Sequence, residues 1–249
     1  MPSYLVTGSS RGLGLSFVAE LLQNPQNHVI ASARSSSSTP ELKALLKQHP
    51  EKSAFVQLDI ADPASIEKAA VDVAKLAPEG LDTLISNAGV NFQPKASLEE
   101  ADLTLFSSEL EVEIVGNTRL VRAFLPLIQK GKGKKLIFVT SGLGSIELAA
   151  SSPNLNATYS VSRAALNMLV RKWGGVLKFQ EITTALVHPG WVPGTEIGAG
   201  IADWVEQYAP QMPKVPVNES AKACVKIFQE VTFEDTNLFW NYDGTKIPW

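Results

Sequence analysis

The sequence has one cysteine, three histidines, little net charge and no apolar run near the roughly 18 residues that a membrane-spanning helix needs. The lone Cys224 excludes an internal disulfide and favours a reducing compartment. His28, His49 and His188 lack metal-ligand spacing, so no metal site is expected. A net charge of −3 gives no electrostatic reason to expect a nucleic acid or a membrane partner. The first apolar strand begins almost at Met1, so no targeting peptide and a cytoplasmic location are expected.

The composition is that of a globular protein with a sizeable core. Of its 249 residues, 45% are hydrophobic and 19% are charged. Neither a repeat nor a shift in composition marks a second domain. We therefore expect residues 1–249 to form one domain.

The N-terminal stretch predicts a nucleotide-binding turn. Residues 4–7 are a short apolar run typical of a buried strand, and Gly8, Gly12 and Gly14 follow it. Apolar residues then return at helical spacing: Leu15, Val18, Leu21 and Leu22. A strand, a glycine turn and a helix together present a helix N-terminus to a phosphate, so we interpret this stretch as a dinucleotide-binding turn.

Strands and helices alternate along the rest of the chain. The further expected strands are apolar runs: His28–Arg34, Ala54–Leu58, Leu81–Ser86, Lys135–Thr140, Thr184–His188 and Leu238–Tyr242. Helices are expected between them, including long ones over Glu109–Gln129 and from near Thr158. This pattern predicts an α/β fold with a doubly wound, mostly parallel, seven-stranded sheet, helices on both faces, and a site at the carboxyl ends of the strands. The alternation lapses over residues 191–216, where a substrate lid is expected.

Several short motifs occur in an order that resembles the short-chain dehydrogenase/reductase family. They are Thr7-Gly8-x-x-x-Gly12-x-Gly14, Asn87-Ala88-Gly89, Ser141, Tyr159 and Pro189-Gly190. The sequence around these motifs is most similar to that of the sniffer-like carbonyl reductases within that family. The resemblance covers essentially the whole chain, and it implies a Rossmann fold, a nicotinamide cofactor and hydride exchange with a carbonyl or alcohol.

The resemblance also implies catalytic roles. Tyr159 corresponds to the family's general acid, and Ser141 to the hydroxyl that holds the substrate oxygen. The family has a Lys four residues after the Tyr, where this chain has Arg163, and an Asn in the preceding helix, where this chain has Glu113. Arg163 lies one helical turn from Tyr159 and keeps a positive charge there, but it cannot release a proton at working pH. We expect Glu113 to pair with Arg163 and thereby to raise the pKa of the phenol.

The charged residues expected near the adenosine ribose favour NADP(H) over NAD. The expected second strand ends at Ala33-Arg34 without the carboxylate that binds the adenosine ribose in NAD enzymes. Arg34 and Arg11 could instead pair with a 2′-phosphate. The full expected cofactor site is Gly8, Ser10, Arg11, Gly12, Leu13, Gly14, Arg34, Asp59, Ile60, Asn87, Ala88, Gly89, Tyr159, Arg163, Pro189, Gly190, Val192 and Thr195.

The expected substrate site combines Ser141 and Tyr159 with apolar residues of the lid: Trp191, Ile197 and Trp204. The loop before Tyr159 adds Leu148, Pro153 and Leu155. These side chains favour a bulky apolar or aromatic ketone, or they simply pack the lid onto the core.

The expected activity is that of an NADP-dependent carbonyl reductase or alcohol dehydrogenase. The altered positions 113 and 163 leave two alternatives open: a cyclase or isomerase that uses the bound nucleotide as a scaffold, and a nucleotide-binding regulatory protein without turnover. The family resemblance further implies a homodimer or homotetramer built on the two long helices, which contain Leu120, Phe124, Leu166 and Leu169.

Overall fold

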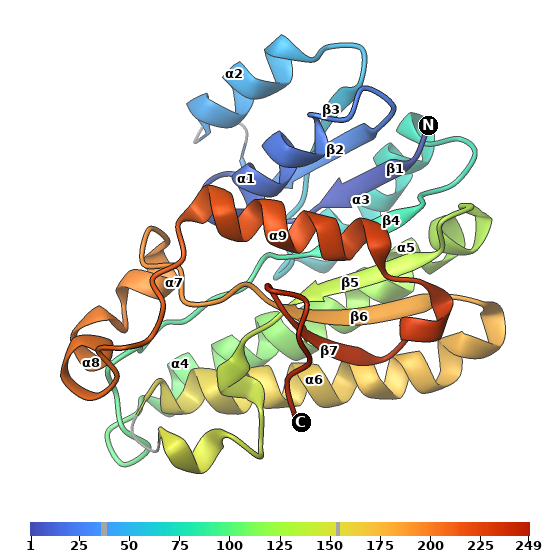
Figure 1. The fold of residues 1–249 in the computed structure, drawn as a ribbon. Helices are drawn as coiled ribbons and strands as arrows, with labels where there is room; N and C mark the ends of the chain where they lie inside the picture. The colour runs from blue at the N-terminus through green and yellow to red at the C-terminus, as the bar shows by residue number, and fades with distance from the viewer. Residues whose placement is uncertain (36–38, 153–154) are drawn as a thin grey trace.

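The computed structural model describes residues 1–35, 39–152 and 155–249. Within these residues, seven strands form one sheet in the order β3-β2-β1-β4-β5-β6-β7, and each neighbouring pair is parallel (Figure 1). The strands are β1 (Ser3–Val6), β2 (His28–Ala33), β3 (Ser53–Gln57), β4 (Thr83–Ser86), β5 (Lys135–Val139), β6 (Thr183–His188) and β7 (Leu238–Asn241). The predicted doubly wound α/β sheet is confirmed.

Strand order reverses beside β1, which lies between β2 and β4. The chain winds outward from β1 to β3, then crosses over to β4 and winds outward in the other direction to β7. At such a switch point the connections leave the carboxyl ends of two neighbouring strands in opposite directions and open a crevice. The crevice therefore lies at the ends of β1 and β4, where Gly8 and Asn87 follow the strands.

Helices cover both faces of the sheet (Figure 1). One apolar cluster joins the sheet to α1 (Gly12–Leu21), α2 (Pro40–Gln48) and α9 (Val217–Glu230). It contains Cys224, which is buried in α9. A second cluster joins the opposite face to α3 (Pro63–Leu76), α5 (Asn117–Lys130) and α6 (Ala157–Leu177). Each face buries apolar residues from strands that are apolar on both sides, and this is why the strands read as continuous apolar runs.

The expected helix over Glu109–Gln129 differs from the structure at its start. The helical run begins at α4 (Leu103–Leu110), whose N-cap Asp102 accepts hydrogen bonds from the backbone N–H groups of Thr104 and Leu105. It then passes through a π-helical turn at Glu111–Gly116 before α5. A π-turn inserts an extra residue into the helix and commonly occurs at functional sites.

The segment 191–216 holds two short helices, α7 (Glu196–Ala199) and α8 (Ala202–Tyr208). Its ends are pinned together, because Trp191 and Lys214 form a parallel bridge. Among the described residues, no helix is both long and apolar enough to cross a membrane.

Candidate functional site

The glycine turn lies between β1 and α1 in a backbone conformation that suits glycine. Gly8 and Gly12 have φ values of +67° and +55°, a region that residues with a Cβ rarely adopt. A Cβ on Gly14 would strike the carbonyl oxygen of Gly8, so only glycine lets α1 approach the turn this closely. The N-cap residue Arg11 makes no side-chain cap to α1. The first N–H groups of the helix are therefore available to an anion.

Thr7 and Asn87 join this turn to the end of β4. The Thr7 hydroxyl oxygen accepts hydrogen bonds from the backbone N–H groups of Asn87 and Ala88 at 2.9 and 3.0 Å. The Asn87 side-chain amide donates to the Thr7 carbonyl at 2.9 Å. Gly8 passes so close to Ala88 that a Cβ would lie 2.9 Å from its Cα. The structure thus brings together the first two motifs of the expected cofactor site.

Tyr159 and Arg163 share one face of α6. The guanidinium carbon of Arg163 lies 4.8 Å from the centre of the Tyr159 ring. Both residues are almost fully buried, at 5% and 4% exposed. Ser141, which follows β5, is also buried, and its side chain lies near enough to the phenol to lower the pKa of Tyr159. The structure therefore brings Ser141, Tyr159 and Arg163 together, as the sequence predicted.

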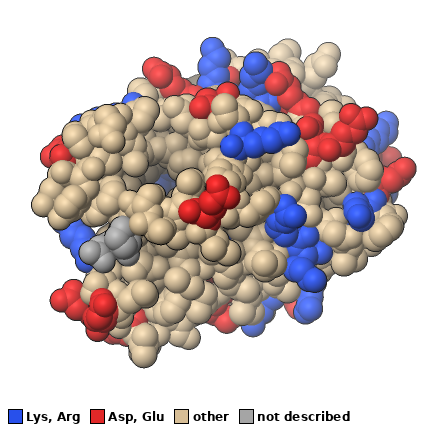
Figure 2. Space-filling view, turned by 60° about the horizontal axis from the view of Figure 1, so that its bottom comes forward, with Lys and Arg blue, Asp and Glu red and all other residues tan. Residues whose placement is uncertain are grey.

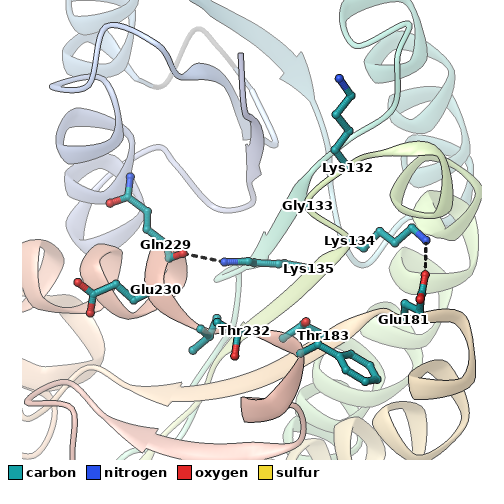
Figure 3. A pocket seen from close by; sticks show the side chains of 11 residues that line it. Lys132, Gly133, Lys134, Lys135, Glu181, Thr183, Gln229, Glu230 and Thr232 are labelled. Carbon is teal, nitrogen blue, oxygen red and sulfur yellow. Dashed lines mark hydrogen bonds and ion pairs between the residues drawn. The ribbon is translucent and has the colours of Figure 1, made fainter.

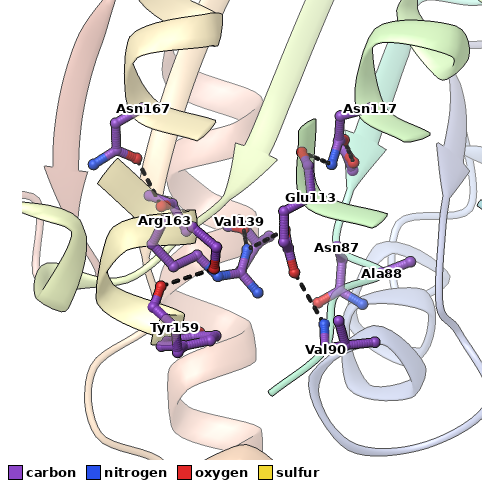
Figure 4. Close-up of polar contacts among 12 residues, drawn as sticks. Asn87, Ala88, Val90, Glu113, Asn117, Val139, Tyr159, Arg163 and Asn167 are labelled. Carbon is purple, nitrogen blue, oxygen red and sulfur yellow. Dashed lines mark hydrogen bonds and ion pairs between the residues drawn. The ribbon is translucent and has the colours of Figure 1, made fainter. Parts of the chain in front are cut away.

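Glu113 meets Arg163 from the π-turn (Figure 4). The Oε2 atom of Glu113 lies 3.1 Å from Nη1 of Arg163, and that nitrogen also donates to the Val139 carbonyl at 3.2 Å. The other carboxylate oxygen of Glu113 accepts a hydrogen bond from the backbone N–H of Val90 at 2.9 Å. The expected contact between the two substituted positions is therefore present, and it is buried.

Gly89 makes room for this ion pair. A Cβ at position 89 would lie 2.8 Å from Oε1 of Glu113 and would strike Nη2 of Arg163. Gly144 also approaches α6 closely, since a Cβ there would lie 2.9 Å from the Cβ of Arg163. The glycines beside the pair thus let the backbone approach both charged side chains.

Burial dominates the electrostatics of the phenol. It raises the pKa of Tyr159 above its ordinary value, and the positive charge of Arg163 opposes this rise. The negative charge of Glu113 raises the same pKa further, while the polar side chains of Arg163 and Ser141 beside the phenol lower it. Burial also raises the pKa of the Glu113 carboxyl, against the opposing influence of Arg163 and the hydrogen bond from Val90. At neutral pH the phenol is therefore protonated, which suits a proton donor.

Glu109 is a member of this site that sequence reasoning missed. It is fully buried, and its Oε1 accepts a hydrogen bond from the backbone N–H of Phe92 at 2.7 Å. The available signal was its spacing, because a residue four positions before Glu113 lies on the same side of a helix. Asn117 also contributes: its amide donates to the Glu113 carbonyl at 2.9 Å and accepts from the Ser86 hydroxyl at 2.6 Å.

The expected adenosine-binding residues lie at the ends of β2 and β3. Arg34 follows β2 and is exposed. Asp59 follows β3, and its carboxylate accepts a hydrogen bond from the Ala61 N–H at 3.0 Å. Ile60 is buried, and its carbonyl lies against Gly116 at the end of the π-turn. Arg11 forms an exposed ion pair with Glu196 of α7.

The segment after β6 holds the last expected cofactor residues. The Pro189 carbonyl accepts a hydrogen bond from the Ser220 hydroxyl at 2.6 Å, and Gly190 has a φ of +81°. The Thr195 hydroxyl donates to the Val192 carbonyl at 2.8 Å and accepts from the Gly198 N–H at 3.0 Å. Thr195 therefore acts as the N-cap of α7. The same residue faces the glycine turn, since a Cβ on Gly12 would lie 3.6 Å from its methyl group.

The aromatic residues of segment 191–216 pack largely on one another. Trp191 is buried, and its indole N–H donates to the Gly198 carbonyl at 2.9 Å. Trp204 and Tyr208 pack with ring centres 5.4 Å apart. Ile197 and Trp204 remain partly exposed. Leu155 is buried, Leu148 is exposed, and Pro153 lies outside the described residues.

The remaining surface offers no comparable cluster in the part of the chain that the structure describes. A shallow depression of about 410 Å³ is lined by Lys132–Lys135, Glu181 and Thr183 (Figure 3). It lies at the amino ends of β5 and β6, opposite the edge that carries Tyr159. On the face shown in Figure 2, charged side chains of both signs lie mainly toward the rim and the right-hand side, and much of the rest of this face is uncharged. The described residues contain no group of three or more His, Cys, Asp or Glu that could hold a metal ion.

Comparison with known proteins agrees with this geometry. Residues 3–206 match the family described as short chain dehydrogenase. The chain is 34% identical over 255 residues to the short-chain dehydrogenase/reductase AacuF of Aspergillus aculeatus, and the match covers 94% of each chain. The NADPH-bound carbonyl reductase from chicken fatty liver has a TM-score of 0.88 at 31% identity, covering 100% of this chain and 99% of that one. The carbonyl reductase Sniffer of D. melanogaster has a TM-score of 0.87 at 29% identity, covering all of both chains.

Proposed function

The chain belongs to the short-chain dehydrogenase family, and we propose that it is an NADP-dependent carbonyl reductase acting on a bulky apolar or aromatic ketone. The observation that carries this proposal is the buried contact of Tyr159 with Ser141 and Arg163. A buried phenol between a hydroxyl and a fixed cation is suited to give a proton to a substrate oxygen. The structural relatives named above include carbonyl reductases.

Tyr159 is the proposed general acid. In the reductive direction its protonated phenol donates to the carbonyl oxygen, while the Ser141 hydroxyl holds the same oxygen. The raised pKa of Tyr159 keeps the proton on the phenol at neutral pH. The reverse reaction needs the phenolate as a base, so oxidation of the alcohol is expected to speed up as the pH rises above neutral.

Arg163 and Glu113 tune this acid. Arg163 stabilises the phenolate that forms when the proton leaves, because its charge lies 4.8 Å from the ring centre. When Glu113 is ionised it offsets part of that charge and slows the proton transfer. Arg163 also supplies guanidinium donors for the nicotinamide ribose, but as a fixed cation it relays no proton.

The glycine turn fits a dinucleotide pyrophosphate. The first N–H groups of α1 lack a side-chain cap, and Gly12 holds the turn open at a positive φ. Asn87 holds the turn against β4, and Pro189, Gly190 and Val192 lie at the end of β6, where we place the nicotinamide. When bound, the cofactor supplies the hydride. Arg34 at the end of β2 would pair with the 2′-phosphate of NADP(H), with Arg11 joining it once released from Glu196.

We propose that residues 1–249 act as one domain and that segment 191–216 is its substrate lid. The partly exposed Ile197 and Trp204 of the lid would contact the substrate directly. Trp191 would act mainly by holding the lid together, because its indole is buried and bonded within the segment. The apolar side chains of this segment favour a substrate with a large hydrophobic group beside the carbonyl.

We also propose, from the sequence argument alone, a cytoplasmic homodimer or homotetramer. Leu120, Phe124 and Leu166 are buried in the core of the protomer, so they cannot form the contact between subunits. The exposed apolar residues of the long helix α6, Val161, Met168 and Val176, are better placed for it.

The test is nucleotide oxidation followed by absorbance with a panel of bulky ketones, using NADPH and NADH in parallel. The proposal expects ketone-dependent oxidation, faster with NADPH. Product formation without nucleotide consumption would favour a cyclase or isomerase instead. Tight nucleotide binding without conversion of any substrate would favour a regulatory protein.

A further inference from the structure

The interior of the protein holds more negative than positive side chains. Among the described residues, the buried charged side chains are Glu109, Glu113 and Arg163. Two acids therefore share one buried base. If both acids were ionised, the core would carry a net charge of −1.

The two acids are bound in the same way to one segment. Oε1 of Glu113 accepts a hydrogen bond from the Val90 N–H, and Oε1 of Glu109 accepts one from the Phe92 N–H. Together they hold the loop that follows Asn87-Ala88-Gly89. The second oxygen of Glu109, Oε2, is buried without a hydrogen-bond partner, whereas that of Glu113 lies 3.1 Å from Nη1 of Arg163. Glu109 therefore has an oxygen on which a proton could reside without breaking the contact to the loop or the ion pair.

The groups facing the acids leave the charge unbalanced. α6 contributes Arg163 and the phenol of Tyr159, and the loop contributes backbone N–H groups. An uncompensated buried charge is costly, and buried groups commonly take up a proton instead. Two buried carboxyls with a single buried cation, which pairs with Glu113 alone, are a setting in which one proton is retained.

We propose that Glu109 and Glu113 retain one proton between them at neutral pH, and that Glu109 is thereby a positioning residue for Tyr159. With that proton bound, the cluster is neutral and the charge of Arg163 remains balanced by a single carboxylate. The pKa of the Glu113 carboxyl shifts in the direction that this proposal requires, since burial and the charge of Glu109 both raise it.

The consequence for catalysis rests on the proposed function of Tyr159. Loss of the shared proton adds a negative charge to the cluster. That charge raises the pKa of the phenol further and weakens its interaction with Arg163. The acid pair would therefore add an ionisation to the pH dependence of ketone reduction, separate from that of the phenol.

The direct test is an NMR titration of the full-length protein labelled with ¹³C at the glutamate carboxyl carbon, which requires no turnover. The wild type is expected to show a buried carboxyl signal with a midpoint above pH 7. In Glu109→Gln the amide oxygen can still accept the hydrogen bond from Phe92, but one of the two acids is gone. The titration midpoint of the remaining acid, Glu113, is then expected to fall below pH 7. The matched control is Glu111→Gln, which changes an exposed acid of the same π-turn that pairs with Arg119. The control should keep the wild-type midpoint.

The proposal is overturned if no glutamate of the wild type titrates above pH 7, or if Glu109→Gln leaves the high midpoint in place. If Glu109→Gln does not fold, Glu113→Gln provides the same test from the other side, and loss of the high midpoint is again expected. The pH profile of ketone reduction then tests the link to Tyr159: the additional ionisation should vanish in Glu109→Gln and persist in Glu111→Gln. An inactive protein whose carboxyl still titrates above pH 7 would refute the proposed reductase and leave the shared proton intact.

Discussion

Replacing Gly89 with alanine is the sharpest perturbation of the buried ion pair. The added Cβ would lie 2.8 Å from the Glu113 carboxylate and would strike the Arg163 guanidinium, so at least one charged side chain must move. Overpacking of a close-packed site commonly costs about 1–3 kcal/mol of unfolding free energy. The cost should lie toward the upper end of that range, because these side chains are buried and hydrogen-bonded to Val90 and Val139.

Gly175→Ala is the matched control for this substitution. Gly175 lies in α6, and a Cβ there would meet nothing within 4 Å. The control should gain about 0.5–1 kcal/mol, as alanine does when it replaces glycine within a helix. Urea unfolding measures both changes, and the pH dependence of ketone reduction reports on the phenol. Equal stability of Gly89→Ala and the wild type, with an unchanged pH profile, would refute the packing of Glu113 and Arg163 described above.

Three further predictions concern charge. In the double variant Glu113→Asn/Arg163→Lys, the change in the pH–rate profile should differ from the sum of the changes in the two single variants, because the two residues are in contact. Additive effects would argue against their pairing. Burial lowers the pKa of His188 to about 4, below its ordinary 6.5, so the neutral form stabilises the fold above pH 6.5 and this contribution is lost as the pH falls toward 4. The loss of unfolding free energy amounts to at most about 3.4 kcal/mol. Urea unfolding of His188→Asn should show a shallower decline over that pH window than the wild type. Arg34→Ala should raise the KM for NADPH about tenfold and leave that for NADH unchanged, whereas equal changes for both would place the 2′-phosphate elsewhere.

Much of the fold follows from the pattern of apolar residues. The expected strands end within two residues of the observed ones, because each is an apolar run bounded by polar or turn residues. The helix cap at Asp62 was also predictable, since an acid before a proline is a common helix start, and its carboxylate indeed accepts from the Ala64 N–H. The contact of Glu113 with Arg163 follows from where the family motifs place them.

Other features depend on contacts between distant parts of the chain. Glu113 and Glu109 accept hydrogen bonds from the backbone of the loop at Val90 and Phe92, and these partners, distant in the sequence, could not be predicted from a local pattern. Arg11 was expected at the 2′-phosphate, but it pairs with Glu196 because α7 packs beside the glycine turn. The direction in which a long surface side chain points depends on its neighbours in space, and spacing along the sequence does not determine it.

The reductase proposal depends most directly on the phenol of Tyr159. The decisive measurement is kcat for ketone reduction in Tyr159→Phe, with NADPH affinity measured in parallel. Tyr4→Phe is the control, because Tyr4 is also a buried phenol whose pKa is raised by burial, but it lies in β1 and in the core. The account predicts a loss of about 10²-fold or more in kcat for Tyr159→Phe at unchanged nucleotide affinity, and little change for Tyr4→Phe. Undiminished turnover in Tyr159→Phe would contradict it.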